Sequence, residues 1–344
     1  MGANHNKFII FVCRKFKKMR KEDLRIVFMG TPEFAVETLS KLVDQGYHVV
    51  AVVTQPDKPV GRHQDTLQAS PVKRYAQAHG LPVLQPEKLK DPAFVSTLKT
   101  YQADLQVVVA FRMLPEVVWA MPRFGTFNVH AALLPQYRGA APINWAIIHG
   151  ERETGVTTFF LDHDIDTGRI ILQKPFPIPE DADVEYVYEG LMRLGATAAI
   201  ETIDKVIAGD GRVESVAQDD WAQKPGGALH SAPKIFKETC QIDWQWPAKR
   251  IYDFVRGLSP YPCAWTNLNV DGKASTLKIY KTAQTTAAYS GAAGQVVVEQ
   301  SRLFVVCGTG CLEILELQLA GKKRMAARDF LNGMRQHDFS FVVQ

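Results

Sequence analysis

The order of apolar and amphipathic segments near the start of the chain constrains the fold more than any other feature. Leu24–Met29 is an apolar run typical of a short buried strand, and Gly30–Pro32 turns it into a helix predicted over Glu33–Asp44. Tyr47–Thr54 then predicts a second strand. Two strands joined through a helix pair in parallel with a right-handed crossover. The sequence therefore predicts an α/β domain with a Rossmann-like parallel sheet.

The first turn of this unit argues against NAD as the first choice of ligand. A dinucleotide site needs Gly-x-Gly-x-x-Gly between strand and helix, whereas this turn has a single glycine, Gly30. Further along, Leu105–Ala110 predicts the central strand, Gly155–Leu161 another strand, and Asp183–Ile207 a long helix that closes the domain. Gln55–Pro71, rich in Pro and polar residues, is predicted to be a long functional loop.

Changes of pattern divide the 344 residues into four segments. Residues 1–23 form a basic extension predicted to be disordered, and residues 24–208 form the α/β domain. Residues 209–227 carry the glycines and the proline expected of a linker. Residues 228–344 carry short β-like runs separated by turn signals, which are typical of a small OB-like β-barrel. The chain is therefore expected to form two domains, each with its own core.

Charge is distributed unevenly, although the net charge is only +4. Residues 1–23 carry +5, residues 24–228 carry −6 and residues 229–344 carry +5. A basic C-terminal part joined to an acidic domain suggests a polyanionic partner, although a solvated surface explains the same excess. The five scattered cysteines suit reduced thiols and no zinc site, and no apolar run reaches membrane-spanning length. We expect a cytoplasmic monomer.

The residues that suggest chemistry stand at the end of a strand predicted over Phe127–His130. Side chains alternate along a strand, so Asn128 and His130 point the same way. An uncharged donor beside a group that titrates near neutral pH suits acyl transfer, because one polarises a carbonyl oxygen while the other moves a proton. The acidic turn Leu161–Gly168 supplies a carboxylate to orient the histidine. The pair alone is more often structural, and the acidic turn favours catalysis.

Several segments together resemble the methionyl-tRNA formyltransferases, a branch of the formyltransferase superfamily. They are NVHAALLPQYRGAAPINWAI, GVTTFFLDHDIDTG, IVFMGTPEFA, the loop TQPDKPVGR…SPVK and GLSPYPCAW, and the match spans about residues 24–335. The Asn-x-His…Asp core is shared by the wider superfamily, and the other segments favour the tRNA enzymes. The resemblance implies a cytoplasmic transferase that moves a formyl group from 10-formyltetrahydrofolate to the α-amine of methionine on initiator tRNA. It implies a role in translation initiation and no metal.

The resemblance also assigns residues. Asn128 falls on the position that donates to the developing oxyanion, His130 on the proton carrier, and Asp166 on the carboxylate that accepts a hydrogen bond from the histidine. Phe34 falls on the position that packs against the methionine side chain, and an ordinary helix-core phenylalanine is the alternative. The implied folate-binding residues are Phe111, Arg112, Met113, Leu114, Ala132, Leu133, Leu134 and Pro135. The implied tRNA-binding residues are Lys58, Arg62, Lys234, Lys249 and Arg250.

The chain departs from the family pattern at several of these places. Ala132 replaces a common Ser, Asp164 a common Gly, and Arg169 a Pro or small residue, while Phe111-Arg112 replaces Tyr-Gly. Two other readings remain open on the sequence alone. One keeps the folate chemistry but uses a small-molecule acceptor, and the other is a non-catalytic RNA-binding protein on an old enzyme scaffold.

Overall fold

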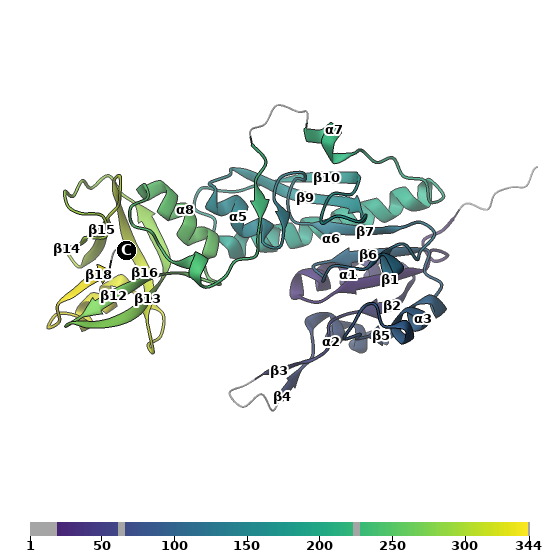
Figure 1. The fold of residues 1–344 in the computed structure, drawn as a ribbon, viewed down its shortest axis with the longest axis horizontal. Helices are drawn as coiled ribbons and strands as arrows, with labels where there is room; N and C mark the ends of the chain where they lie inside the picture. Colours follow the sequence, from purple (N-terminus) through teal and green to yellow (C-terminus); the bar gives the residue numbers. More distant parts are fainter. Residues whose placement is uncertain (1–18, 61–65, 223–227, 343–344) are drawn as a thin grey trace, which may run out of the picture.

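The computed structural model describes residues 19–60, 66–222 and 228–342, which form two domains side by side (Figure 1). Most of the predicted extension, residues 1–18, and Arg62 lie outside the described residues. The part of the extension that is described forms a turn, in which the Asp23 amide donates to the Arg20 carbonyl at 3.0 Å. Met19 packs against the core of the first domain.

The first domain is built on a sheet whose strands follow the order β10-β9-β7-β6-β1-β2-β5. The bounds are β1 Ile26–Gly30, β2 Val49–Val53, β5 Val83–Leu84, β6 Leu105–Val109, β7 Thr126–His130, β9 Glu153–Phe160 and β10 Ile170–Pro177. Neighbouring strands from β5 to β7 pair in parallel, which confirms the predicted Rossmann-like sheet. Strands β9 and β10 extend it with antiparallel pairing, β9 on β7 and β10 on β9.

Alternation along β1 separates the two faces of the sheet. Ile26 and Phe28 belong to the core cluster under the helices on one face, whereas Val27 and Met29 belong to the cluster on the other face. The first face is covered by α1 (Glu33–Asp44), α2 (Pro71–Ala78), α5 (Pro142–Ile148) and α6 (Val184–Ala208). The second face is covered by α3 (Pro92–Thr100) and α4 (Glu116–Trp119).

The long polar loop predicted between residues 55 and 71 contains a hairpin at its base. Strands β3 (Lys58–Val60) and β4 (Thr66–Gln68) pair in antiparallel fashion and project from the domain (Figure 1). The hairpin is held by an ion pair between Lys73 Nζ and Asp57 Oδ2 at 2.6 Å. Gln85 Nε2 donates to the other Asp57 oxygen at 2.8 Å. These contacts anchor the hairpin to the sheet domain.

The second domain is a curled antiparallel sheet with the strand order β14-β15-β16-β13-β12-β18, and β17 pairs on β16. The bounds are β12 Ala264–Val270, β13 Lys273–Gln284, β14 Val296–Glu299, β15 Arg302–Val306, β16 Cys311–Leu319, β17 Met325–Ala326 and β18 Phe339–Val342. Its core is closed by α8 (Ala248–Leu258), α9 (Ala327–Gly333) and the fully buried Trp244. The fold agrees with the predicted OB-like class, as a half-barrel.

The domains meet where α8 packs on α5 (Figure 1). Asn144 Nδ2 donates to the Gly257 carbonyl at 2.9 Å across this contact. A Cβ at Gly257 would lie 2.6 Å from the Ile148 side chain, so glycine permits the close approach of the helices. Arg256, buried beside Asp253, donates to the Ala182 carbonyl at 2.8 Å. The contact is close-packed and hydrogen-bonded.

The segment predicted as a linker packs along the first domain on its way to the second. Val216 forms a β-bridge with Ile170, and α7 (Gln218–Ala222) follows beside β10 (Figure 1). After the undescribed residues 223–227, β11 (Ser231–Ala232) pairs in parallel with β8 (Arg138–Gly139). The connector, residues 209–232, is therefore attached through its described parts to β10 and to the loop that follows β7.

Candidate active site

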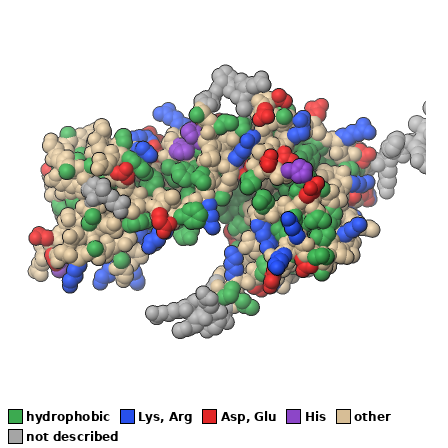
Figure 2. Space-filling model, viewed as in Figure 1, with side chains coloured by type: hydrophobic (Ala, Val, Ile, Leu, Met, Phe, Trp, Pro, Cys, Tyr) green, Lys and Arg blue, Asp and Glu red, His purple; other side chains and the backbone are tan. Residues whose placement is uncertain are grey.

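A cavity of about 710 Å³ opens at the carboxyl ends of β6 and β7. This is the edge at which open α/β sheets bind ligands. Its wall combines apolar side chains with Asn128, His130 and Asp166, so the structure brings the three predicted catalytic residues together. Figure 2 shows histidine and acidic side chains gathered with apolar ones on this face of the first domain.

The alternation along β7 explains why Asn128 and His130 share one side. Phe127 and Val129 belong to the core cluster under the helices, so the intervening side chains turn away from it toward the cavity. His130 is 6% exposed, and Asn128 is partly exposed. The predicted orientation of the pair is therefore confirmed by the packing of its neighbours.

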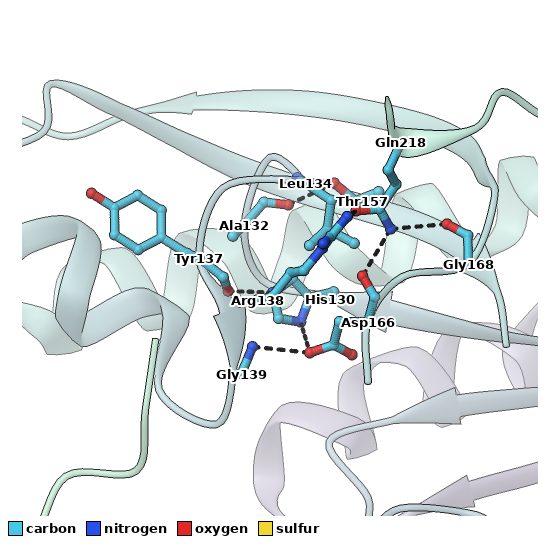
Figure 3. A network of polar contacts seen from close by, with 10 residues as sticks. All are labelled: His130, Ala132, Leu134, Tyr137, Arg138, Gly139, Thr157, Asp166, Gly168 and Gln218. Atoms are coloured by element: carbon cyan, nitrogen blue, oxygen red, sulfur yellow. Dashed lines mark hydrogen bonds and ion pairs between the residues drawn. The ribbon is translucent and has the colours of Figure 1, made fainter. Parts of the chain in front are cut away.

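The imidazole of His130 is held by a backbone carbonyl. Its Nε2 lies 2.9 Å from the carbonyl oxygen of Tyr137, which can only accept, so Nε2 carries the hydrogen (Figure 3). Nδ1 faces Asp166 Oδ2 at 3.8 Å, which is too long for a hydrogen bond. The expected hydrogen bond from His130 to Asp166 is thus absent, and the carboxylate acts on the ring as a nearby charge.

Asp166 is fixed from two sides. Its Oδ2 accepts from the Gly139 amide at 3.0 Å, and its carbonyl accepts from Gln218 Nε2 at 2.8 Å (Figure 3). The backbone of Asp166 has a φ of +56°, a left-handed conformation that costs a non-glycine residue about 1–2 kcal/mol. These bonds offset that strain and hold the carboxylate in front of His130.

An apolar chamber lies next to the catalytic residues. Phe34, 5% exposed, lines the cavity, and its ring meets Tyr188 edge-on with centroids 5.2 Å apart. The Tyr188 hydroxyl accepts from the Phe34 backbone amide at 3.0 Å, which holds the Tyr188 ring against the start of α1. Val184 and Ile143 also line the cavity. The position predicted for the methionine pocket is therefore apolar and rigid.

The segment predicted to bind folate divides into two parts. Phe111, Arg112, Met113 and Leu114 line the cavity, and Met113 is 72% exposed at its edge. The guanidinium of Arg112 donates to the carbonyls of Pro86 and Glu87, and burial lowers its pKa. Arg112 therefore anchors the loop after β6 to the segment that follows β5.

The other part, residues 132–135, is not among the described residues that line this cavity. The hydroxyl of Thr157 donates to the Ala132 carbonyl at 2.6 Å and accepts from the Leu134 amide at 3.0 Å (Figure 3). Gln173 Nε2 donates to the Leu134 carbonyl at 2.7 Å. These backbone groups shape the loop between His130 and Tyr137.

The substitutions noted in the acidic turn have visible consequences. Asp164 contributes a further carboxylate to the cavity wall, beside Asp166. Arg169 is directed away to the connector, where its Nε donates to Ser215 Oγ at 3.0 Å. Asp164 therefore adds a negative charge at the cavity, whereas Arg169 holds the turn against Ser215.

The basic residues predicted to contact tRNA differ in their surroundings. Lys58 begins the projecting hairpin, and Arg250 stacks on Trp246 at 3.9 Å. Lys234 lies 5.4 Å from the ring of the exposed Phe236. Lys249 is bound to both carboxylate oxygens of the buried Asp253, at 2.8 and 2.7 Å, so its charge is engaged within the domain.

Four residues that support the site were not predicted from the sequence. They are Tyr137, which uses its carbonyl, Gly139, which uses its backbone amide, Thr157, which uses its hydroxyl, and Gln218, which uses its side-chain amide. The first two act through backbone atoms, which residue types do not reveal. Among the described residues, no group of three His, Cys, Asp or Glu side chains is arranged to hold a metal ion.

The chain was compared with known protein families. A profile described as "Formyl transferase" matches residues 24–203, and one described as "Formyl transferase, C-terminal domain" matches residues 234–335. The chain belongs to the formyl transferase family. A protein named methionyl-tRNA formyltransferase from Parabacteroides distasonis is 58% identical over 320 residues, covering 92% of this chain and 98% of the relative. The protein of that name from Bacteroides fragilis is 56% identical over 317 residues, covering 92% and 96%.

Solved structures share the fold at low identity. HypX from Aquifex aeolicus, in complex with tetrahydrofolic acid, has a TM-score of 0.60 at 16% identity and covers 91% of this chain and 48% of that one. WlaRD, a sugar 3N-formyl transferase, has a TM-score of 0.59 at 17% identity, covering 87% of this chain and 99% of that one.

None of the helices in the described ranges combines the length and apolar character needed to span a bilayer.

Proposed function

We propose that this chain transfers the formyl group of 10-formyltetrahydrofolate to the α-amine of methionine carried by initiator tRNA, for translation initiation. The observation that carries the proposal is the meeting of Asn128, His130 and Asp166 on the wall of one cavity with an apolar chamber beside it. Relatives that match the chain almost end to end bear the name of this activity.

The cavity suits the formyl donor. Ligand sites of about 300–1,000 Å³ with mostly apolar walls and few polar groups are typical for molecules of this size. The side chains of Phe111, Met113 and Leu114 offer apolar contact to a flat ring system, and their backbone offers donors and acceptors. We assign the donor to this loop, with the formyl group toward Asn128. Bound there, 10-formyltetrahydrofolate supplies a carbonyl that an amine can attack.

The apolar chamber suits the acceptor. The methionine side chain has the flexibility to fill the space between Phe34, Ile143 and Tyr188, and sulfur–aromatic contacts are favourable. Placement there points the α-amine toward His130. A charged or strongly polar side chain finds few partners in this chamber, so the pocket selects methionine over polar amino acids.

Asn128 and His130 then divide the chemistry. The Asn128 amide donates to the oxygen that becomes negative as the amine attacks, and such a donor contributes about 10²–10³ in rate. His130 takes the proton from the attacking amine at Nδ1, because Nε2 is committed to the Tyr137 carbonyl. As the C–N bond to the folate breaks, the proton is delivered to the leaving nitrogen.

Asp166 makes this proton transfer favourable. Its carboxylate, 3.8 Å from Nδ1, attracts the positive charge that the ring acquires. The side chain of Asp166 is 15% exposed, so solvent screens the pair only in part. The Tyr137 carbonyl keeps the ring in the orientation that presents Nδ1 to the cavity.

The tRNA body requires a larger surface. The β3–β4 hairpin, with Lys58, projects from the first domain, and Lys234 and Arg250 lie in the C-terminal part of the chain (Figure 1). Both regions offer positive charge to phosphates. Arg250 and Trp246 form a stacked pair suited to a nucleobase or a phosphate. We further propose that the protein acts as a cytoplasmic monomer, with no second copy needed to complete the site.

The test is formyl transfer from 10-formyltetrahydrofolate to methionine-charged initiator tRNA, with methionine-charged elongator tRNA as the control. Formylmethionyl initiator tRNA should form, and the elongator should react poorly. No product with either tRNA, while tetrahydrofolate still binds, would overturn the tRNA acceptor and direct the search to small amines. A loss of product in an Asn128→Ala variant would separate catalysis from an RNA-binding role.

A further inference from the structure

The connector between the domains inserts one buried amide side chain into the support of the catalytic turn. Gln218 begins α7 and is 3% exposed, although its neighbours Asp219 and Asp220 are exposed. Nothing in the mechanism above uses this residue. Its position is notable because the connector is otherwise a link between two separately folded domains.

All hydrogen-bonding groups of the Gln218 side chain are used. Its Nε2 donates to the carbonyls of Asp166 at 2.8 Å and Gly168 at 2.9 Å (Figure 3). Its Oε1 accepts from Arg138, from Nε at 2.9 Å and from a terminal nitrogen at 2.6 Å. A buried amide with every partner in place is rigid, and removing it leaves the remaining partners unpaired.

The partners of Gln218 are the two segments that hold the catalytic pair. Asp166 and Gly168 belong to the acidic turn, which presents the carboxylate. Arg138 stands between Tyr137, whose carbonyl holds His130, and Gly139, whose amide holds Asp166. One side chain therefore bridges the segment that orients the imidazole and the segment that orients the carboxylate.

The connector strengthens this bridge at a second point. Strand β11 pairs with Arg138 and Gly139, and the Tyr137 amide donates to the His230 carbonyl at 2.7 Å. Asp166 has a left-handed φ of +56°, a conformation that aspartate adopts more readily than most residues with a side chain. Gln218 donates to the carbonyl of that same residue.

We propose that Gln218 is a positioning residue for formyl transfer, which holds Asp166 at its working distance from His130 and makes the interdomain connector part of the catalytic support. The inference rests on the proposed function and adds a residue to the same site. Gln218 is not itself among the described residues that line the cavity, so it acts through Asp166 and the Arg138 segment.

The first experiment compares full-length Gln218→Leu with wild type under saturating 10-formyltetrahydrofolate and Met-tRNA. Leucine fills similar volume and loses every hydrogen bond. A displacement of about 1 Å in a catalytic group costs about 100-fold in rate, so kcat should fall by about 10- to 100-fold. The KM for tRNA and the binding of tetrahydrofolate should stay within about twofold of wild type, because neither surface changes.

The matched control is Asp219→Asn, an exposed neighbour on the same short helix. It should leave kcat unchanged.

A second variant, Gln218→Glu, keeps an acceptor for Arg138 but places a carboxylate oxygen against the carbonyls of Asp166 and Gly168. It should retain the fold through its ion pair with Arg138 and still lose rate, which preserves the test if the leucine variant unfolds.

A double-mutant cycle separates positioning from general destabilisation. If Gln218 acts through Asp166, Gln218→Leu should cost little in an Asp166→Asn background, whereas independent effects would multiply. Full multiplication, or a wild-type kcat in both Gln218 variants, would overturn the inference. Failure of the wild-type protein to formylate Met-tRNA would instead overturn the proposed function, so the two failures are distinguishable.

Discussion

Replacing Gly139 by alanine tests whether the site requires the close contact between β8 and β11 of the connector. The residue has a φ of +129°, and a Cβ there would lie 2.4 Å from the Ala232 carbonyl oxygen. That oxygen is itself held by the amides of Ala140, at 2.7 Å, and Ala141, at 3.2 Å. The obstacle is therefore backbone fixed on the connector, and a rotamer change cannot relieve the contact.

The cost has two parts. The unfavourable φ costs about 1–2 kcal/mol, and overpacking against fixed backbone costs about 1–3 kcal/mol. Their sum of about 2–5 kcal/mol corresponds to a loss of roughly 4–20 °C in the melting temperature for a domain of this size. Relief requires β11 and β8 to separate by about 1 Å, which moves the Gly139 amide from Asp166 and lowers kcat by about 100-fold.

The assay pairs thermal unfolding with steady-state formyl transfer, and Gly80→Ala is the matched control. Gly80 also has a positive φ, +66°, but a Cβ there meets no atom within 4 Å. The control should lose about 1–2 kcal/mol of stability and keep its kcat. If Gly139→Ala matches Gly80→Ala in both measurements, the contact between the connector and the loop does not constrain the site, and the reasoning is wrong.

Three further variants test other parts of the structure. His130→Ala removes the proton carrier and should slow formyl transfer by about 10²–10⁴-fold, while Met-tRNA binding in a filter assay stays near wild type; equal losses would make the ring structural. Asp57→Asn breaks the ion pair with Lys73, which holds the pKa of Asp57 below its usual value, and should raise the KM for tRNA with tetrahydrofolate binding unchanged. Asp253→Ala leaves the buried Arg256 without its carboxylate and should cost about 3–5 kcal/mol in urea unfolding, whereas a loss below about 1 kcal/mol would show that solvent reaches the guanidinium.

The parallel sheet of the first domain could be predicted from the sequence because local patterns specify its strands and helices. The apolar runs and the helix of residues 24–54 specify a parallel unit, and alternation along β7 places Asn128 beside His130. The hairpin β3–β4 and the closing strand β18 were not predicted, since each is short and gains its stability from pairing with a distant or facing strand.

The sequence by itself determined the fold class, the identity of the three residues in the cavity wall and the family to which the chain belongs. Those features depend on residue types at fixed spacing along a strand or turn, so they do not depend on what the strand or turn packs against. The tertiary structure decided how His130 is held, because the Tyr137 carbonyl and the Gly139 amide are backbone groups that every residue carries. It also decided that Gln218, 52 residues from Asp166, completes the catalytic turn. Contacts of that range arise only when the connector folds back, so no local pattern encodes them.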